Sequence, residues 1–481
     1  MAAVSPYRKF LKEAPSHRLR PEALYKVGHC QFREGKFREA IKALDSFVRD
    51  FPSEPRSPWA LFLSAEAHLK LKEKEEALKR YLAVDARYSG SPPHKGSLAK
   101  AASLKFASRA YTEALALLRK LKRLGPEPEQ RALVAFLEAE SLFGLKKYED
   151  AEKAYGLFIK SHAKSPDVPE ALFKRGLSAY RAGRVREALE HIEGGLARMT
   201  PRQRKEAFYL AARGSEKVGS LRKAASFWGL FLKESKGDPR EAEALLSLAL
   251  ARYGLKNYAG AASALKIWLK RFAKRPERRE VYLLLGHALL GAGDFKGAAR
   301  AYESLFAQGF VPTGAIFNLA YAYDKLGETE KAFETFRRYL KARPGAEDEG
   351  EVALRMGILA LELGKDKEAR EAFERASRKG KGALRSEARF RLAELKLKGG
   401  RRGEALKLLL ALSKEGAEPW AGEAALRAGA LLEEGKRWRE ALRLYRLIPK
   451  GSKVWRQAQE RIGKIDAYLK AREKVGEGKR P

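Results

Sequence analysis

The residues best able to do chemistry in this chain are too dispersed to form a recognisable active site. Its seven histidines fall in different parts of the sequence, and none stands at metal-ligand spacing to another histidine, a cysteine or a carboxylate pair. The sequence contains no glycine-rich phosphate loop, nucleophile elbow or kinase signature. The single cysteine, Cys30, excludes an internal disulfide framework. We therefore predict a protein that is not an enzyme and that uses no metal or cofactor.

The chemistry that remains is noncovalent binding, and the net charge of the chain indicates the charge of its partner. Lys and Arg total 98 against 61 Asp and Glu, for a formal net charge of +37, and basic residues run from Arg8 to Arg480. Such a charge attracts anionic partners, whether acidic proteins, nucleic acid, or anionic lipid and envelope polymers. The net charge alone does not choose among them.

The elements that would position binding residues follow from an internal repeat, mostly of 36 or 37 residues. Each repeat carries an alanine, a small residue twelve positions before it, and a large apolar residue four positions after it. The alanines are Ala40, Ala77, Ala114, Ala151, Ala188, Ala224, Ala261, Ala298, Ala332, Ala369, Ala405 and Ala441. The small residues are Gly28, Ala65, Ala102, Ala139, Gly176, Ala212, Ala249, Gly286, Ala320, Gly357, Ala393 and Gly429. The large residues are Leu44, Tyr81, Leu118, Tyr155, Ile192, Trp228, Leu265, Tyr302, Phe336, Phe373, Leu409 and Tyr445.

This triple predicts a helical hairpin in every repeat. Two antiparallel helices approach closely only where small side chains face each other and a bulky one fills the neighbouring groove. Seven repeats also have glycine five residues before the alanine, where a left-handed residue can end the first helix. These glycines are Gly35, Gly183, Gly219, Gly293, Gly327, Gly364 and Gly400. Prolines near the end of the second helix then separate one repeat from the next.

The same marks resemble the tetratricopeptide repeat, a family of helix-turn-helix units. The best match is residues 313–344, where the motif slots hold Ile316, Leu319, Ala320, Tyr323, Ala332, Phe336 and Pro344. The resemblance implies an all-α fold, a right-handed α-solenoid (superhelix) of about twelve tetratricopeptide-like repeats with a C-terminal capping helix. The period is longer than the 34 residues of the family pattern. The lengthened turns resemble those of bacterial envelope-type repeat proteins, namely the outer-membrane assembly lipoproteins and the non-catalytic arm of soluble lytic transglycosylases.

Four segments are expected along the chain. Residues 1–20 form an N-terminal lead-in, residues 21–450 the repeat superhelix, residues 451–474 the capping helix, and residues 475–481 a disordered tail. The capping helix is predicted from an apolar stripe that includes Trp455, Ile462 and Leu469.

Partner binding in such an array is expected on the concave face, which the first helix of each repeat lines. An apolar ladder occupies the position three residues before each small residue, and basic residues and Asn318 occupy the next position. The candidate partner-binding residues are Tyr25, Lys26, Phe62, Lys100, Phe136, Phe173, Lys174, Tyr209, Phe317, Asn318, Tyr321, Arg355, Phe390, Arg391 and Arg427. The aromatic residues can also serve packing between repeats, and the basic residues can form an ordinary solvated face, so these alternatives stay open.

The expected function is a non-enzymatic scaffold or adaptor that binds an acidic peptide or helix of a partner protein. A basic, nucleic-acid-associated repeat protein is one alternative, motivated by the charge. A non-catalytic accessory arm of a bacterial cell-envelope or peptidoglycan-processing complex is the other, and it follows only from the resemblance. A clamp for the acidic tail of a chaperone is disfavoured, because it pairs Lys with Asn and this chain has only two asparagines.

The location in the cell is predicted from the N-terminus. Residues 1–10 contain no apolar run of the length that a secretory signal needs. The sequence as it stands therefore predicts a cytoplasmic protein, and a periplasmic or envelope location stays open for a chain whose leader has been removed.

Overall fold

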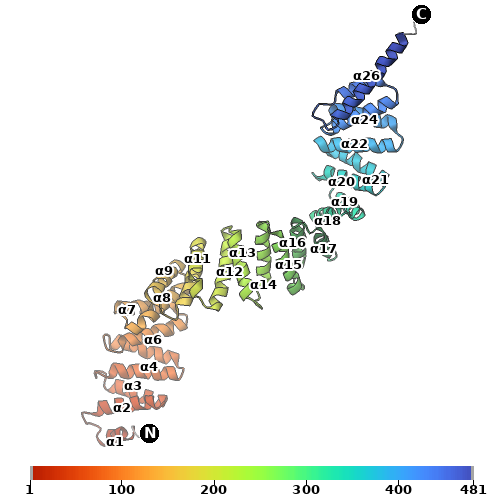
Figure 1. Ribbon diagram of the computed structural model, residues 1–481. Helices are drawn as coiled ribbons and strands as arrows, with labels where there is room; N and C mark the ends of the chain where they lie inside the picture. Colours follow the sequence, from red (N-terminus) through yellow and green to blue (C-terminus); the bar gives the residue numbers. More distant parts are fainter. Residues whose placement is uncertain (1–3, 478–481) are drawn as a thin grey trace. The chain divides into compact units, whose positions relative to one another are not determined.

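The structure is a computed structural model that describes residues 4–477, and within that range every regular element is a helix (Figure 1). The chain divides into two compact units, residues 1–248 and 249–481, at a point inside helix α14 (Glu241–Gly254). The first unit contains α1 (Ser5–Glu13), α2 (Arg20–Arg33), α3 (Phe37–Asp50), α4 (Ser57–Lys70), α5 (Lys74–Arg87), α6 (His94–Ala107), α7 (Tyr111–Arg123), α8 (Pro128–Gly144), α9 (Tyr148–Ser161), α10 (Val168–Arg181), α11 (Val185–Gly195), a short 3-10 helix (Leu196–Arg198), α12 (Pro201–Lys217) and α13 (Leu221–Glu234). The second unit contains α15 (Tyr258–Phe272), α16 (Arg278–Gly291), α17 (Phe295–Phe306), α18 (Thr313–Leu326), α19 (Thr329–Ala342), α20 (Glu349–Glu362), α21 (Asp366–Lys379), α22 (Gly382–Lys398), α23 (Arg402–Glu415), α24 (Trp420–Glu434), α25 (Trp438–Arg446) and α26 (Trp455–Glu477).

Helices α2 to α25 form twelve consecutive helix pairs, which confirms the predicted α-solenoid of helical hairpins. Within each unit, the helices other than α14 pack against their neighbours in the sequence. A chain arranged in this way buries its apolar surface between sequence neighbours, so each repeat depends on the next for its core.

The predicted triple of small, alanine and large residues makes the core of each hairpin. All twelve alanines are at most 1 % exposed and all twelve large residues at most 3 %, with Tyr81 and Tyr155 at 0 %. The small residue lies directly under the large one. A Cβ atom on Gly28 would lie 2.6 Å from Cγ of Leu44, and one on Gly357 would lie 2.6 Å from Cε1 of Phe373. The small residue is therefore required by the close approach of the two helices.

The turn between the two helices of a hairpin uses one backbone conformation throughout. The seven predicted glycines all have positive φ, from 70° at Gly364 to 83° at Gly183. The other five repeats adopt the same conformation at the same position with a basic residue, as at Lys72 (φ 64°) and Lys256 (φ 59°). The left-handed residue is thus a requirement of the hairpin itself, and glycine only lowers its conformational cost.

The two ends of the array contain helices outside the twelve pairs. Helix α1 lies within the expected lead-in, and α26 occupies the expected capping segment, where Val454, Ala458 and Ile465 are buried against the last hairpin. Residues 475–477, expected in the tail, belong to α26, and residues 478–481 lie outside the described residues. None of the helices between residues 4 and 477 combines the length and the apolar character that a membrane span needs.

Candidate partner-binding faces

The fifteen candidate residues form two groups, one in each compact unit, and all lie on first helices of the hairpins. Eight of them, from Tyr25 to Tyr209, belong to the first unit, and seven, from Phe317 to Arg427, belong to the second. Lys100, Tyr321 and Arg427 are exposed, and the other twelve are partly exposed. The fifteen residues, called the first-helix ladder below, are therefore open to solvent within each unit.

Five aromatic members of the first-helix ladder pack against the second helix of their own hairpin, namely Tyr25, Phe62, Phe136, Tyr209 and Phe317. Phe62 meets the ring of Tyr81 edge-on at 5.6 Å, and Phe136 lies 5.3 Å from the ring of Phe158. Phe317 repeats the arrangement with Tyr339 at 5.5 Å. One side of each ring thus contributes to the hairpin core, and the partly exposed remainder is free for contact with a partner.

Four basic members of the ladder bind a carboxylate of the preceding repeat. Lys100 Nζ lies 3.0 Å from Glu66 Oε1, and Lys174 Nζ lies 3.3 Å from Glu140 Oε2. The hydroxyl groups of Tyr81 and Tyr155 donate to the same two carboxylates, Glu66 and Glu140.

The second unit has the same contact at two places. Arg355 donates to both oxygens of Asp324, at 2.8 and 2.5 Å, and Arg427 Nε donates to Glu394 at 2.9 Å. These cations bridge neighbouring repeats, so their charge is already matched within the chain.

Tyr209 is the candidate most enclosed by charged neighbours. The guanidinium of Arg240 lies 4.6 Å from the centre of its ring and donates to Glu206 at 2.7 and 2.8 Å. Arg240 also donates to Asp238, and this hydrogen bond, aided by Lys205, holds the pKa of the Asp238 carboxyl far below its usual range. The Tyr209 hydroxyl donates to Glu243, 3.2 Å away. This face of the first unit is held by an ion-pair network that spans two repeats.

Two further members of the ladder, Arg391 and Tyr321, differ from these in their surroundings. Arg391 bonds Glu387 at 3.3 Å on its own helix and lies 5.7 Å from the centre of the Trp420 ring. Tyr321 is 39 % exposed, and the ammonium of Lys325 lies 5.3 Å from its ring centre. Tyr321 is accordingly the most accessible aromatic residue of the ladder.

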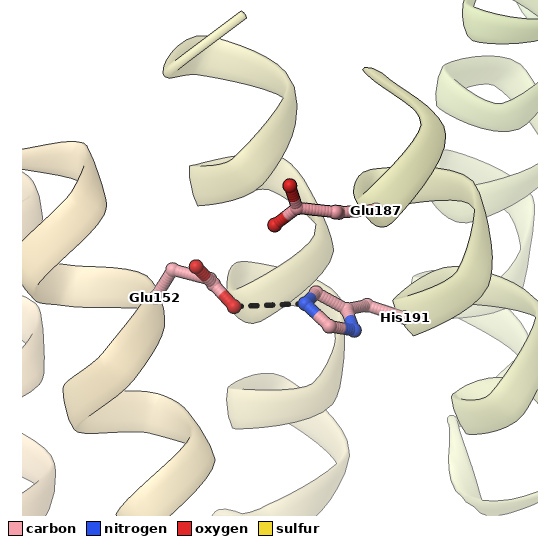
Figure 2. A group of neighbouring side chains, drawn as sticks. All are labelled: Glu152, Glu187 and His191. Carbon is pink, nitrogen blue, oxygen red and sulfur yellow. Dashed lines mark hydrogen bonds and ion pairs between the residues drawn. The ribbon is translucent and has the colours of Figure 1, made fainter. Parts of the chain in front are cut away.

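The sequence analysis missed one cluster of metal-ligand type on the first unit. Ligand atoms of Glu152, Glu187 and His191 lie within 4.8 Å of one another, and Glu187 and His191 are four residues apart on α11 (Figure 2). The nearly buried Glu152 carboxylate is already bound, to His191 Nε2 at 2.8 Å and to Arg184 at 2.5 Å.

The charges around Glu152 explain what this cluster does. Burial acts to raise the pKa of Glu152, but the hydrogen bonds from His191 and Arg184 outweigh it and hold the pKa below its usual value. Arg175 lies a further 3.7 Å from the same carboxylate. Two guanidinium groups repel a divalent cation, so we interpret the cluster as a bridge between two repeats.

Comparison with known proteins identifies the class. The model of a tetratricopeptide repeat family matches residues 25–92, 136–202, 216–276, 283–347 and 354–418, which is more than half of the chain. The chain therefore belongs to the tetratricopeptide repeat family, as the sequence marks predicted. Proteins of this family generally mediate protein–protein interaction and are generally non-catalytic scaffolds.

Similar solved structures are also repeat proteins, and their likeness concerns the fold alone. The structure of Naa15/Naa10 bound to HypK-THB is 15 % identical, with a TM-score of 0.41, over 92 % of this chain and 72 % of that chain. MamA from Desulfovibrio magneticus RS-1 is 21 % identical, with a TM-score of 0.30, over 36 % of this chain and 93 % of that chain. A tetratricopeptide repeat protein from Parabacteroides merdae is 17 % identical, with a TM-score of 0.29, over 56 % of this chain and 99 % of that chain. No curated protein matches the sequence.

Proposed function

We propose that the chain is a non-enzymatic interaction scaffold that binds an acidic segment of a partner protein on the first-helix ladder within a unit. The observation that carries the proposal is the exposure of the ladder. None of its fifteen residues is buried, although the large apolar residues of the second helices are buried almost completely. Partly exposed aromatic side chains at regular spacing within each unit suit an extended peptide or a helix.

The charge of the chain supports an acidic partner. The net charge of +37 favours encounter with anionic surfaces. Because Lys100, Lys174, Arg355 and Arg427 already bind carboxylates, the ladder would offer mainly apolar and aromatic contacts, with the charge acting at longer range.

Affinity purification of the full chain from its native cell extract, with and without nuclease, tests the proposal. Wild type should retain proteins that survive nuclease treatment, and the double variant Tyr321→Ser/Arg427→Ser should lose them. Leu447→Ser is the matched control, because Leu447 is 61 % exposed in the same unit but lies outside the ladder. Loss of all retained material on nuclease treatment would overturn the proposal in favour of nucleic-acid binding.

A further inference from the structure

A second surface, in the second unit and outside the first-helix ladder, has the shape and charge of a binding groove. Two hollows of 320 and 570 Å³ lie along α15, α16 and α17. Both are lined by Lys266, Leu289 and Asp294, so they form one continuous groove, called the α15–α17 groove below.

The floor of the α15–α17 groove is apolar. Ala262, Leu285, Leu289 and Ala301 line it and are each at most 5 % exposed. Ile267 stands at its side with 45 % of its surface exposed, and no apolar neighbour covers that part. An apolar floor with an exposed aliphatic side chain is typical of a surface that receives the apolar stripe of a helix.

The rims of the α15–α17 groove are basic and lack acidic partners. Lys266 and Lys270 line it from α15, and Lys296 and Arg300 line it from α17. All four are exposed, and none is ion-paired with a carboxylate in the part of the chain that the structure describes. The one acidic residue in the lining, Asp294, caps α17 by accepting the Gly297 N–H at 2.8 Å. Four cations against one carboxylate leave the lining with a net positive charge, which attracts an anionic partner.

We propose that the α15–α17 groove binds an amphipathic, acidic helix of a partner protein. The apolar stripe of that helix would cover Ile267 and the floor, and its carboxylates would meet Lys266, Lys270, Lys296 and Arg300. The inference rests on the proposed scaffold function for the class of partner, a protein, but it uses a different surface. Nucleic acid is the weaker occupant, because the floor is aliphatic and offers few aromatic rings on which bases could stack.

Binding of a labelled peptide to the full chain tests the groove. The probe is a fluorescein-labelled helical peptide of about 18 residues with glutamates on one face and leucines on the other. Anisotropy should report binding to wild type that weakens as salt is raised. Lys266→Glu/Lys296→Glu should weaken it about tenfold or more. The matched control is Lys274→Glu/Arg279→Glu, which makes the same change of charge at exposed residues outside the lining and should bind within about twofold of wild type.

Three further arms make the outcome decisive. Ile267→Ser should weaken binding with no change of charge, and a scrambled peptide of the same composition should bind less tightly than the amphipathic one. If both charge-reversal pairs weakened peptide binding equally, the proposal for the groove would be overturned, because the effect would then come from net charge alone. A labelled single-stranded DNA that binds more tightly than the peptide and is equally sensitive to Lys266→Glu/Lys296→Glu would also overturn it.

The two proposals fail separately. Circular dichroism of every variant shows whether it keeps its helices. If the peptide fails to bind while the full chain still retains proteins after nuclease treatment, the proposal for the groove is wrong and the proposed scaffold function is supported. If no protein is retained but the peptide binds through Lys266 and Lys296, the scaffold on the first-helix ladder is wrong.

Discussion

Two stretches of the second unit use the same hairpins and the same number of basic residues in opposite ways. Residues 249–302 and residues 324–377 are equal in length and each contain eleven Lys and Arg. The first stretch has three acidic residues and the second has thirteen. In the second stretch the cations bind carboxylates, as Arg355 binds Asp324, Lys365 binds Glu330 and Arg375 binds Glu349.

In the first stretch, four cations, Lys266, Lys270, Lys296 and Arg300, have no carboxylate partner in the described part of the chain and rim the α15–α17 groove. The difference shows that basic residues serve two purposes in this array. Where carboxylates are provided, the cations join neighbouring repeats, and where they are withheld, the cations form a surface that can attract an acidic partner.

The largest effect is expected where a paired cation is removed. In Arg375→Met, the Glu349 carboxylate, only 5 % exposed, loses an ion pair of 2.6 Å and keeps the N–H of Gly345 and the more distant Lys379 Nζ at 4.0 Å. Removing the nearer cation from a buried carboxylate should lower the free energy of unfolding by about 2 to 3 kcal/mol. Lys270→Met and Arg300→Met, at the rim of the α15–α17 groove, should each change the free energy of unfolding by less than about 0.5 kcal/mol. Urea denaturation followed by circular dichroism measures the free energy of unfolding of all three variants. Equal losses of stability would show that the cations of the two stretches do not differ in their structural role.

The second prediction tests whether the two stretches share one scaffold. A Cβ on Gly286 would lie 2.5 Å from Cε1 of Tyr302, and one on Gly357 would lie 2.6 Å from Cε1 of Phe373. Gly286→Ala and Gly357→Ala should therefore each lower the free energy of unfolding, by about 2 kcal/mol. Gly314→Ala is the control, because a Cβ there meets no atom within 4 Å. A loss in one stretch only would mean that the hairpins differ in packing as well as in charge.

The sequence predicted the hairpins well because their signals recur within one repeat. A small residue, an alanine and a large residue at fixed spacing describe contacts inside one pair of helices, as between Gly357 and Phe373. Ion pairs between repeats escaped prediction, since their partners are about one repeat apart, as with Lys174 and Glu140. These pairs join residues 31 to 35 apart, slightly less than one period, so a search for acidic residues at that distance before each cation would have found them.

The α15–α17 groove escaped prediction for a different reason. Its lining comes from three helices, and its unpaired charge depends on which side chains meet in space. The net charge of the whole chain concealed the local excess of cations in residues 249–302, which a charge count along the chain would have revealed.

The third prediction concerns the left-handed turn residue that both stretches require. Lys256 has φ 59° and Gly364 has φ 70° at equivalent positions. Lys256→Gly should raise the free energy of unfolding by about 1 kcal/mol, and Gly364→Ala should lower it by about as much. Lys256→Ala separates the two possible causes. Lys256→Ala removes the charge and keeps the Cβ, so its free energy of unfolding should be close to that of wild type. A gain in stability as large as that of Lys256→Gly would mean that the charge, and not the Cβ, is the cause.

The smallest effect is expected from pH, and it should arise in the paired stretch. Burial of Glu349 acts to raise its pKa, while Arg375 and the Gly345 N–H act to lower it, so the pKa ends below the usual value of 4.5. The folded protein therefore holds this proton less tightly than the unfolded chain. The resulting stability is fully present above the unfolded pKa and is lost as the pH falls through the folded one. Urea midpoints measured between pH 7 and pH 3 should fall less steeply in Glu349→Gln than in wild type, whereas Lys270→Met should follow the wild-type curve. An unchanged acid dependence in Glu349→Gln would show that the Glu349–Arg375 pair does not couple folding to protonation.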